Sequence, residues 1–168
     1  NRYILEYDSV LAEPDNAIQT SVLMETSFAE ISFPTVLLPV HSYIGDMMME
    51  EAPGQIENYR LELFEMKVQG IDRTLADKVV ALCDYYLQRR IKKHSRHLYD
   101  IYKLLPIVPL DAGFAQLVRE VRAERAKTNI CPSAQPGVDV SELLNTIIEN
   151  DVYKDDYETI TSRILEEP

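Results

Sequence analysis

The spacing of apolar positions changes character near Gly70. Before it, the chain consists mainly of short apolar or alternating runs, which are typical of strands. A single segment there, residues 43–51, fits a short helix that Pro53 and Gly54 would end. The predicted strands are Arg2–Tyr7, Ser21–Ser27, Thr35–Val40 and Asn58–Val68.

After Gly70 the apolar residues recur at helical spacing. Thr74, with Asp77 three positions later, has a capping-box arrangement and predicts the start of a helix that continues to about Arg90. The further predicted helices run from a cap at Ser95 to Pro106, from Asp111 to about Lys127, over Glu142–Asn150 after a cap at Ser141, and from Asp155 to about Glu166. Strands first and helices afterwards indicate an α+β fold, with a β-rich part over 1–70 and a helical subdomain over 71–168.

Composition indicates an ordinary globular protein without a disulfide framework. The chain has 168 residues, 46% hydrophobic and 27% charged, and only two cysteines, which form no CxxC pair. No apolar run approaches the ~20 residues that a membrane helix needs, so no membrane partner is expected. The first residues form neither a signal peptide nor an initiator methionine, and we expect a truncated or processed cytoplasmic protein.

The formal net charge of −11 is distributed unevenly. Residues 67–127 carry 13 of the 17 Lys and Arg against seven Asp and Glu, whereas the rest of the chain is strongly acidic. The densest basic stretch holds Arg89, Arg90, Lys92 and Lys93, which are candidates for contact with RNA phosphates. The alternative is a solvated corner between two helices.

Two helical residues are candidates for phosphate chemistry. Lys78 lies about 60° from the centre of the apolar stripe of its helix, where it can either extend to water or direct its ammonium into a cleft. Arg96 and Asp100 are i,i+4 neighbours on the next helix. Such a pair on an exposed face contributes only ~0.3–0.5 kcal/mol to helix stability, unless that face lines an active-site wall.

Glu25 is a carboxylate in an apolar strand, which suggests either a metal ligand or the exposed end of that strand. Two or three converging carboxylates would be needed to hold the Mg²⁺ of a nucleotidyl-transfer site. The chain has no Asp-x-Asp, Gly-rich phosphate loop, GxSxG elbow or HExxH motif. His94 and His97 have i,i+3 spacing, but their basic surroundings disfavour a bound dication.

Arg73–Lys78 and Ser95–Leu105 together resemble the C-terminal signature of the AbiEii/AbiGii family of nucleotidyltransferase-like toxins. Several other segments resemble that family in the same order: the strand with Glu25, His41–Asp46, Cys131–Ala134, Asp151–Glu158 and Ile160–Arg163. The resemblance implies that residues 1–70 are the remnant of a nucleotidyltransferase β-sheet. It also implies that Lys78 and Asp100 are active-site residues, with Arg73 and Arg96 near phosphate and Glu25 as a metal ligand.

The activity implied by this resemblance is Mg²⁺-dependent transfer of a nucleotide from an NTP to an acceptor such as tRNA. It would act in a type IV toxin–antitoxin or phage-defence system, with an AbiEi-type antitoxin encoded in the same operon. The family's upstream glycine motif and paired acids have no counterpart here, so we expect residues 1–168 alone to be inactive. The alternative is a non-catalytic module that binds RNA or a protein through its basic helical face.

Overall fold

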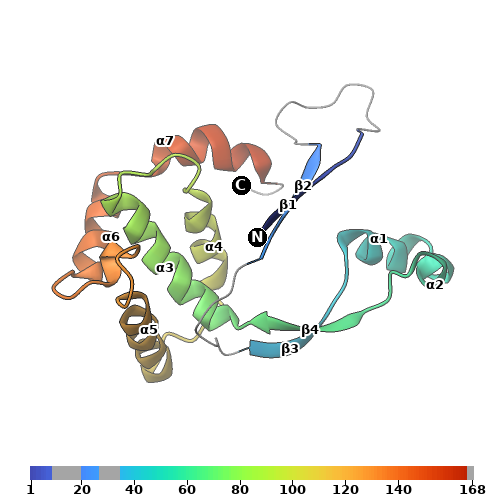
Figure 1. Ribbon diagram of the computed structural model, residues 1–168, viewed down its shortest axis with the longest axis horizontal. Helices are drawn as coiled ribbons and strands as arrows, with labels where there is room; N and C mark the ends of the chain where they lie inside the picture. Colours follow the sequence, from blue (N-terminus) through green and yellow to red (C-terminus); the bar gives the residue numbers. More distant parts are fainter. Residues whose placement is uncertain (9–19, 27–34, 166–168) are drawn as a thin grey trace. The chain divides into compact units, whose positions relative to one another are not determined.

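The computed structural model describes residues 1–8, 20–26 and 35–165, and its elements confirm the predicted α+β class. The contacts divide the chain into two compact units, residues 1–33 and 34–168. The second unit therefore contains two strands as well as all the helices of the described residues (Figure 1). The boundary predicted at residue 70 stays a prediction. The predicted ends of two elements, at Ser27 and Glu166, lie outside the described residues.

The described part of the first unit is an antiparallel hairpin of β1 (Arg2–Glu6) and β2 (Ser21–Glu25). Its register pairs Arg2 with Glu25 and Ile4 with Leu23. The apolar side chains of both strands are largely exposed, at 61% for Ile4 and 44% for Leu23. A hairpin with so much exposed apolar surface buries little within its own unit.

The second unit begins with β3 (Thr35–Val40), which pairs antiparallel with β4 (Phe64–Gln69). Between these strands lie α1 (Tyr43–Glu51), a 3₁₀ turn at Pro53–Gln55 and the short α2 (Ile56–Tyr59). The predicted strand over Asn58–Val68 is therefore wrong in its first half. The chain there completes a helix that ends at Arg60 in the left-handed region, with φ of 53°.

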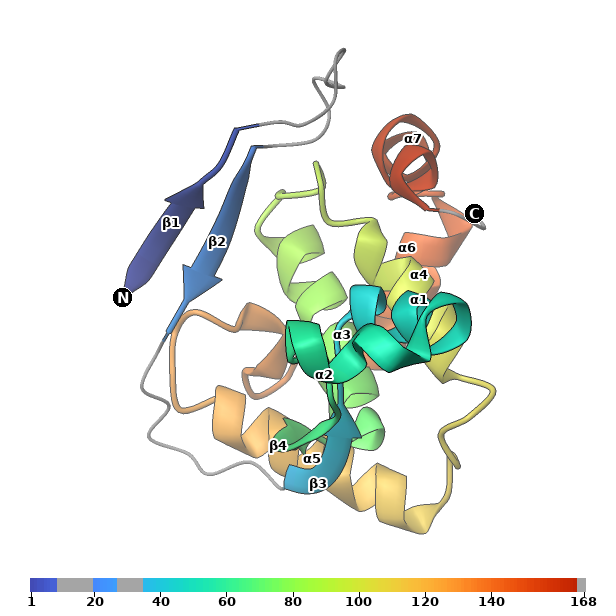
Figure 2. The same ribbon diagram turned by 90° about the vertical axis from the view of Figure 1, so that its right-hand side faces the viewer.

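Helix α3 (Ile71–Leu87) runs through the middle of the helical part (Figure 1 and Figure 2). Around it are α4 (Arg96–Leu104), α5 (Ala112–Arg125), a 3₁₀ turn at Pro132–Ala134 and α6 (Val140–Glu149). The chain then forms α7 (Lys154–Asp156), a π-helical turn at Tyr157–Thr161 and a 3₁₀ turn at Ser162–Ile164. The predicted single helix from Asp155 is thus a composite of three short pieces.

Two of the predicted helix starts are wrong by a few residues. Helix α3 begins at Ile71 rather than at Thr74, because the Thr74 hydroxyl donates to the carbonyl of Gly70 from inside the first turn. Helix α6 is capped by Asp139, whose carboxylate accepts from two backbone amides, and not by Ser141. In both cases a polar residue in the first turn was mistaken for the cap.

The core has two parts, which lie at different positions along α3. One contains Leu82, Cys83, Ile147 and Tyr153 and joins α3 to α4 and α6. The other contains Ala76, Val80 and Val121 and joins α3 to α5. Because α3 is covered on several sides, the polar residues between these apolar positions contact neighbouring helices, and this is what assembles the candidate site.

Candidate functional site

Lys78 of α3 and Asp100 of α4 form a direct ion pair. The Lys78 Nζ donates to Asp100 Oδ2 at 2.6 Å, and the two side chains are 30% and 35% exposed. A mobile ligand can therefore reach both groups from solvent. The structure brings together, across 22 positions of sequence, the two residues that the resemblance implies are active-site residues.

His97 lies beside this ion pair and was not among the predicted site residues. Its Nδ1 is 3.7 Å from the same Asp100 oxygen, which is longer than a hydrogen bond. The residue is 8% exposed, and neither ring nitrogen has a hydrogen-bond partner in the described part of the chain. Burial, with the charges of Lys78 and Arg96, lowers the pKa of His97 to about 4, against the opposing effect of Asp100. The imidazole is therefore neutral near pH 7.

An aromatic stack holds the His97 ring in place. Tyr85 of α3 stacks on His94 at 3.5 Å between ring centroids and lies nearly parallel to His97 at 5.6 Å. Burial is the main cause that lowers the pKa of His94 as well, followed by the charges of Arg90 and Arg96. This stack of three rings reaches the Lys78–Asp100 pair through His97. The i,i+3 spacing of His97 and Asp100 is the sequence signal that could have identified it.

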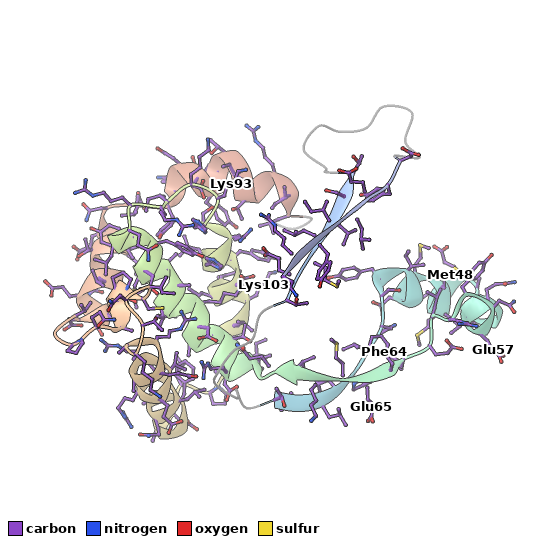
Figure 3. The ribbon with its side chains drawn as sticks, viewed as in Figure 1. Met48, Glu57, Phe64, Glu65, Lys93 and Lys103 are labelled. Carbon is purple, nitrogen blue, oxygen red and sulfur yellow. The ribbon has the colours of Figure 1, made fainter. Side chains whose placement is uncertain are left out.

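The corner between α3 and α4 carries the basic stretch noted in the sequence. Arg89, Arg90, Lys92, Lys93 and Arg96 are all exposed, and Figure 3 labels Lys93 at this corner and Lys103 on α4. Arg89 and Lys93 have φ of 55° and 68°, so the corner turns through left-handed residues. It stays folded because Asp156 accepts from the backbone amides of Lys93 at 2.7 Å and Ser95 at 3.1 Å.

Arg73 lies in a different environment from the other predicted site residues. The residue is 5% exposed, and its guanidinium donates to Asp77 at 3.1 Å and to Glu124 at 3.0 Å. Asp77 also accepts two bonds from Arg125, at 2.9 and 3.2 Å. These contacts tie α3 to α5 and account for Arg73 structurally, while its contact with phosphate stays a prediction.

Glu25 belongs to the other compact unit, where it occupies the end of β2. Its carboxylate is 67% exposed and lies 3.5 Å from the Arg2 guanidinium. The apolar context in the sequence therefore reflects neighbours along the strand and not burial of Glu25 itself. Its predicted role as a metal ligand stays a prediction.

The described residues do not fit a complete divalent-metal site. Among residues 1–8, 20–26 and 35–165, no group of three or more His, Cys, Asp or Glu side chains could hold an ion. Asp100 is the acidic group of the Lys78 pair, and a lone carboxylate with an ammonium at 2.6 Å is a poor Mg²⁺ ligand set. What this arrangement can do is offer one cation and one proton acceptor to a phosphate-bearing substrate.

Comparison with known proteins adds one finding. Residues 1–168 match the family described as nucleotidyl transferase AbiEii toxin, type IV TA system. No curated protein and no solved structure gives a significant match. In the described helices, none is both long and apolar enough to cross a membrane.

Proposed function

We propose, since the chain belongs to the AbiEii family of nucleotidyl transferase toxins of type IV toxin–antitoxin systems, that Lys78 and Asp100 act in nucleotide transfer. The reaction would move a nucleoside monophosphate from an NTP to a hydroxyl of an acceptor such as tRNA: the hydroxyl oxygen bonds to the α-phosphorus, and the bond to the β-phosphate breaks to release pyrophosphate. The observation that carries this proposal is the half-exposed 2.6 Å ion pair between α3 and α4. An AbiEi-type antitoxin encoded beside the toxin, acting in the cytoplasm, is the partner that this family implies.

The roles of the two residues follow from an exchange of partners. In the free protein the Lys78 ammonium neutralises Asp100. An incoming triphosphate offers Lys78 a more highly charged partner, and a lysine is well suited to phosphoryl oxygens as a point charge. Asp100 is then released to accept a hydrogen bond, and finally the proton, from the hydroxyl of the acceptor. Arg96, on the same helix, supplies further positive charge for phosphate.

Magnesium enters this proposal only as a requirement of the family's reaction. When bound, it would neutralise charge on the triphosphate. Since the described residues do not form its ligand set, no step above passes through it. For the same reason we propose that residues 1–168 alone do not turn over NTP.

The test uses the protein as its gene encodes it, alongside residues 1–168 alone. Each preparation is incubated with Mg²⁺, each labelled NTP in turn and total tRNA. We expect label on RNA with the gene product, reduced about 100-fold or more by Lys78→Ala or Asp100→Asn. Lys67→Ala, on the exposed face of β4, is the matched control and should leave transfer unchanged. Full transfer by both site variants would refute the proposal.

A second candidate is RNA binding without catalysis. It is favoured by the exposed basic residues at the α3–α4 corner, which need no contribution from Lys78 or Asp100. A folded protein that binds tRNA in a salt-dependent manner, transfers no label with any NTP and is indifferent to both site variants would support it.

A further inference from the structure

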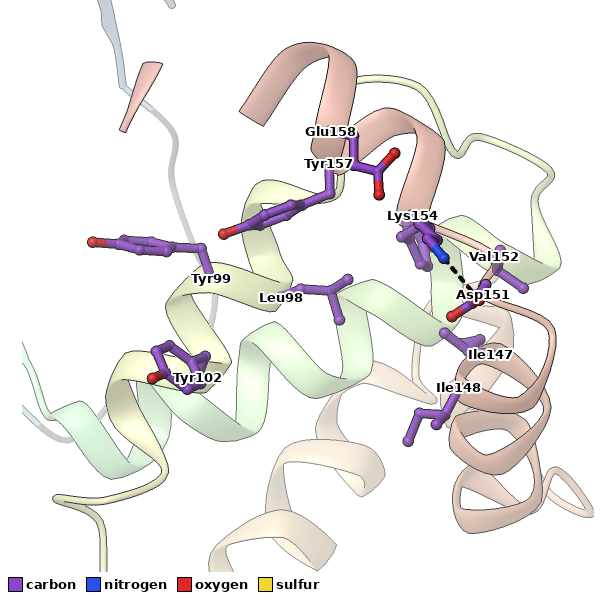
Figure 4. A pocket seen from close by; sticks show the side chains of 11 residues that line it. Leu98, Tyr99, Tyr102, Ile147, Ile148, Asp151, Val152, Lys154, Tyr157 and Glu158 are labelled. Carbon is purple, nitrogen blue, oxygen red and sulfur yellow. Dashed lines mark ion pairs between the residues drawn. The ribbon is translucent and has the colours of Figure 1, made fainter. Parts of the chain in front are cut away.

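A shallow groove of about 440 Å³ lies beside the candidate site, between α4 and the segment that joins α6 to the π-helical turn (Figure 4). Its floor and sides are apolar, from Leu98, Ile147, Ile148 and Val152. Tyrosine rings extend from both walls, Tyr99 and Tyr102 from α4 and Tyr157 from the opposite side. We propose that this groove binds an unpaired nucleobase of the acceptor RNA, an inference that rests on the proposed function.

The groove presents the surface on which a planar base can stack. Tyr102 is 70% exposed. Ile148 on the other wall is 69% exposed. Aromatic side chains in an open apolar groove are the usual platform for single-stranded bases, because every base has a π-face.

Charge on α4 favours RNA over an apolar protein segment. Residues 89–104 contain six basic residues and one acidic residue, Asp100. At 100° per residue, Tyr99 is followed around α4 by Lys103, Arg96 and then Asp100. The Lys103 ammonium lies 5.3 Å from the centroid of Tyr99 and 5.9 Å from that of Tyr102. The base at one RNA end would thus lie in the groove. Its phosphate would lie beside Lys103 and Arg96, and its terminal hydroxyl would lie at Asp100.

Two carboxylates at the groove set the orientation of a bound base. Asp151 is engaged by Lys154 at 3.5 Å, whereas the Glu158 carboxylate makes no hydrogen bond or ion pair within the described ranges of the chain. A free carboxylate repels phosphate and accepts from the exocyclic amino groups of adenine, cytosine and guanine. The base therefore enters the groove with its phosphate outward, and amino-bearing bases are preferred over uracil.

The probe is a short oligoribonucleotide that ends in the fluorescent base 2-aminopurine, titrated with the protein in the absence of NTP. Stacking should quench its fluorescence, and Tyr102→Ala or Tyr157→Ala should weaken binding about 5- to 100-fold. The Phe variants at both positions keep the ring and should bind normally. Tyr43→Ala is the matched control, because Tyr43 is 93% exposed on α1. Circular dichroism of each variant checks that the helices are intact.

Unchanged quenching and affinity in both alanine variants would overturn the groove assignment. The groove assignment would also be overturned if Tyr102→Ala lost antitoxin binding but bound the probe normally. That result would indicate that the groove binds a protein partner. The assay separates this proposal from the proposed reaction, because it requires no turnover. Probe binding without label transfer would refute the reaction alone, and transfer that is insensitive to Tyr102→Ala would refute the groove alone.

Discussion

Asp77 and Lys78 are adjacent in sequence, yet their substitution should have different effects on the stability of the protein. Asp77 accepts from Arg73 of its own helix at 3.1 Å and from Arg125 of α5 at 2.9 Å. The side chains of Asp77, Arg73 and Arg125 are 18%, 6% and 27% exposed. Burial lowers the pKa of Arg125, but the hydrogen bond and charge of Asp77 outweigh it and raise the pKa overall. The Asp77→Asn variant removes this shared anion.

Removing one partner of a buried ion pair costs ~3–5 kcal/mol, because the other charge is left uncompensated. The lower end applies here, since Arg73 keeps its 3.0 Å bond to Glu124 and water reaches Arg125. We expect Asp77→Asn to lower the free energy of unfolding by about 3 kcal/mol and Tm by roughly 6–12 °C. Lys78→Ala, at a half-exposed pair, should change stability by at most about 1 kcal/mol.

Thermal melts and urea titrations of both variants measure these differences. The matched control is Glu120→Gln, the same kind of isosteric change at an exposed position of α5, with an expected effect within about 0.5 kcal/mol. If Asp77→Asn were no less stable than this control, the network between α3 and α5 would not contribute as argued.

Three further outcomes follow from buried polar groups. Because the folded pKa of His97 is about 4, below its ordinary value of 6.5, the unfolded chain binds more protons between these values. Stability should therefore fall by roughly 3 kcal/mol as pH drops through this window, and His97→Gln should flatten the pH dependence of urea midpoints. Asp156→Ala should destabilise the protein by about 3 kcal/mol in urea titrations, since it removes the acceptor for the amides of Lys93 and Ser95. Tyr153→Phe deletes a buried 2.8 Å bond to a backbone carbonyl of α3 and should lower the free energy of unfolding by about 1 kcal/mol, measured in the same way.

The sequence pattern predicted the class of the fold because the spacing of apolar residues along the chain is a local property. The change near Gly70 from short runs to helical spacing is visible without tertiary information, and α3, α4 and α5 lie close to their predicted ranges. Cap positions were less predictable, since Thr74 can bond either forward as a cap or back to Gly70. The four residues after Tyr59 were assigned to a strand because alternation there continues without a break.

Only part of the candidate site could be predicted from the sequence. The resemblance identified Lys78 and Asp100, but spacing alone could not show that they meet, because that depends on how α4 rotates against α3. The same rotation buries His97 and exposes Tyr102. A wheel drawn for one helix cannot tell which of its sides a neighbouring helix covers.

The hydrogen bonds from the backbone amides of Lys93 and Ser95 to Asp156 have a consequence for biosynthesis. Lys93 and Asp156 are 63 positions apart, so the basic corner emerges from the ribosome well before Asp156 does. At 5–20 residues per second, the delay is about 3–13 seconds. During this interval α3 and α4 exist without the contact that fixes their connection. The geometry of the link between the helices that carry Lys78 and Asp100 is therefore completed only after Asp156 has been synthesised.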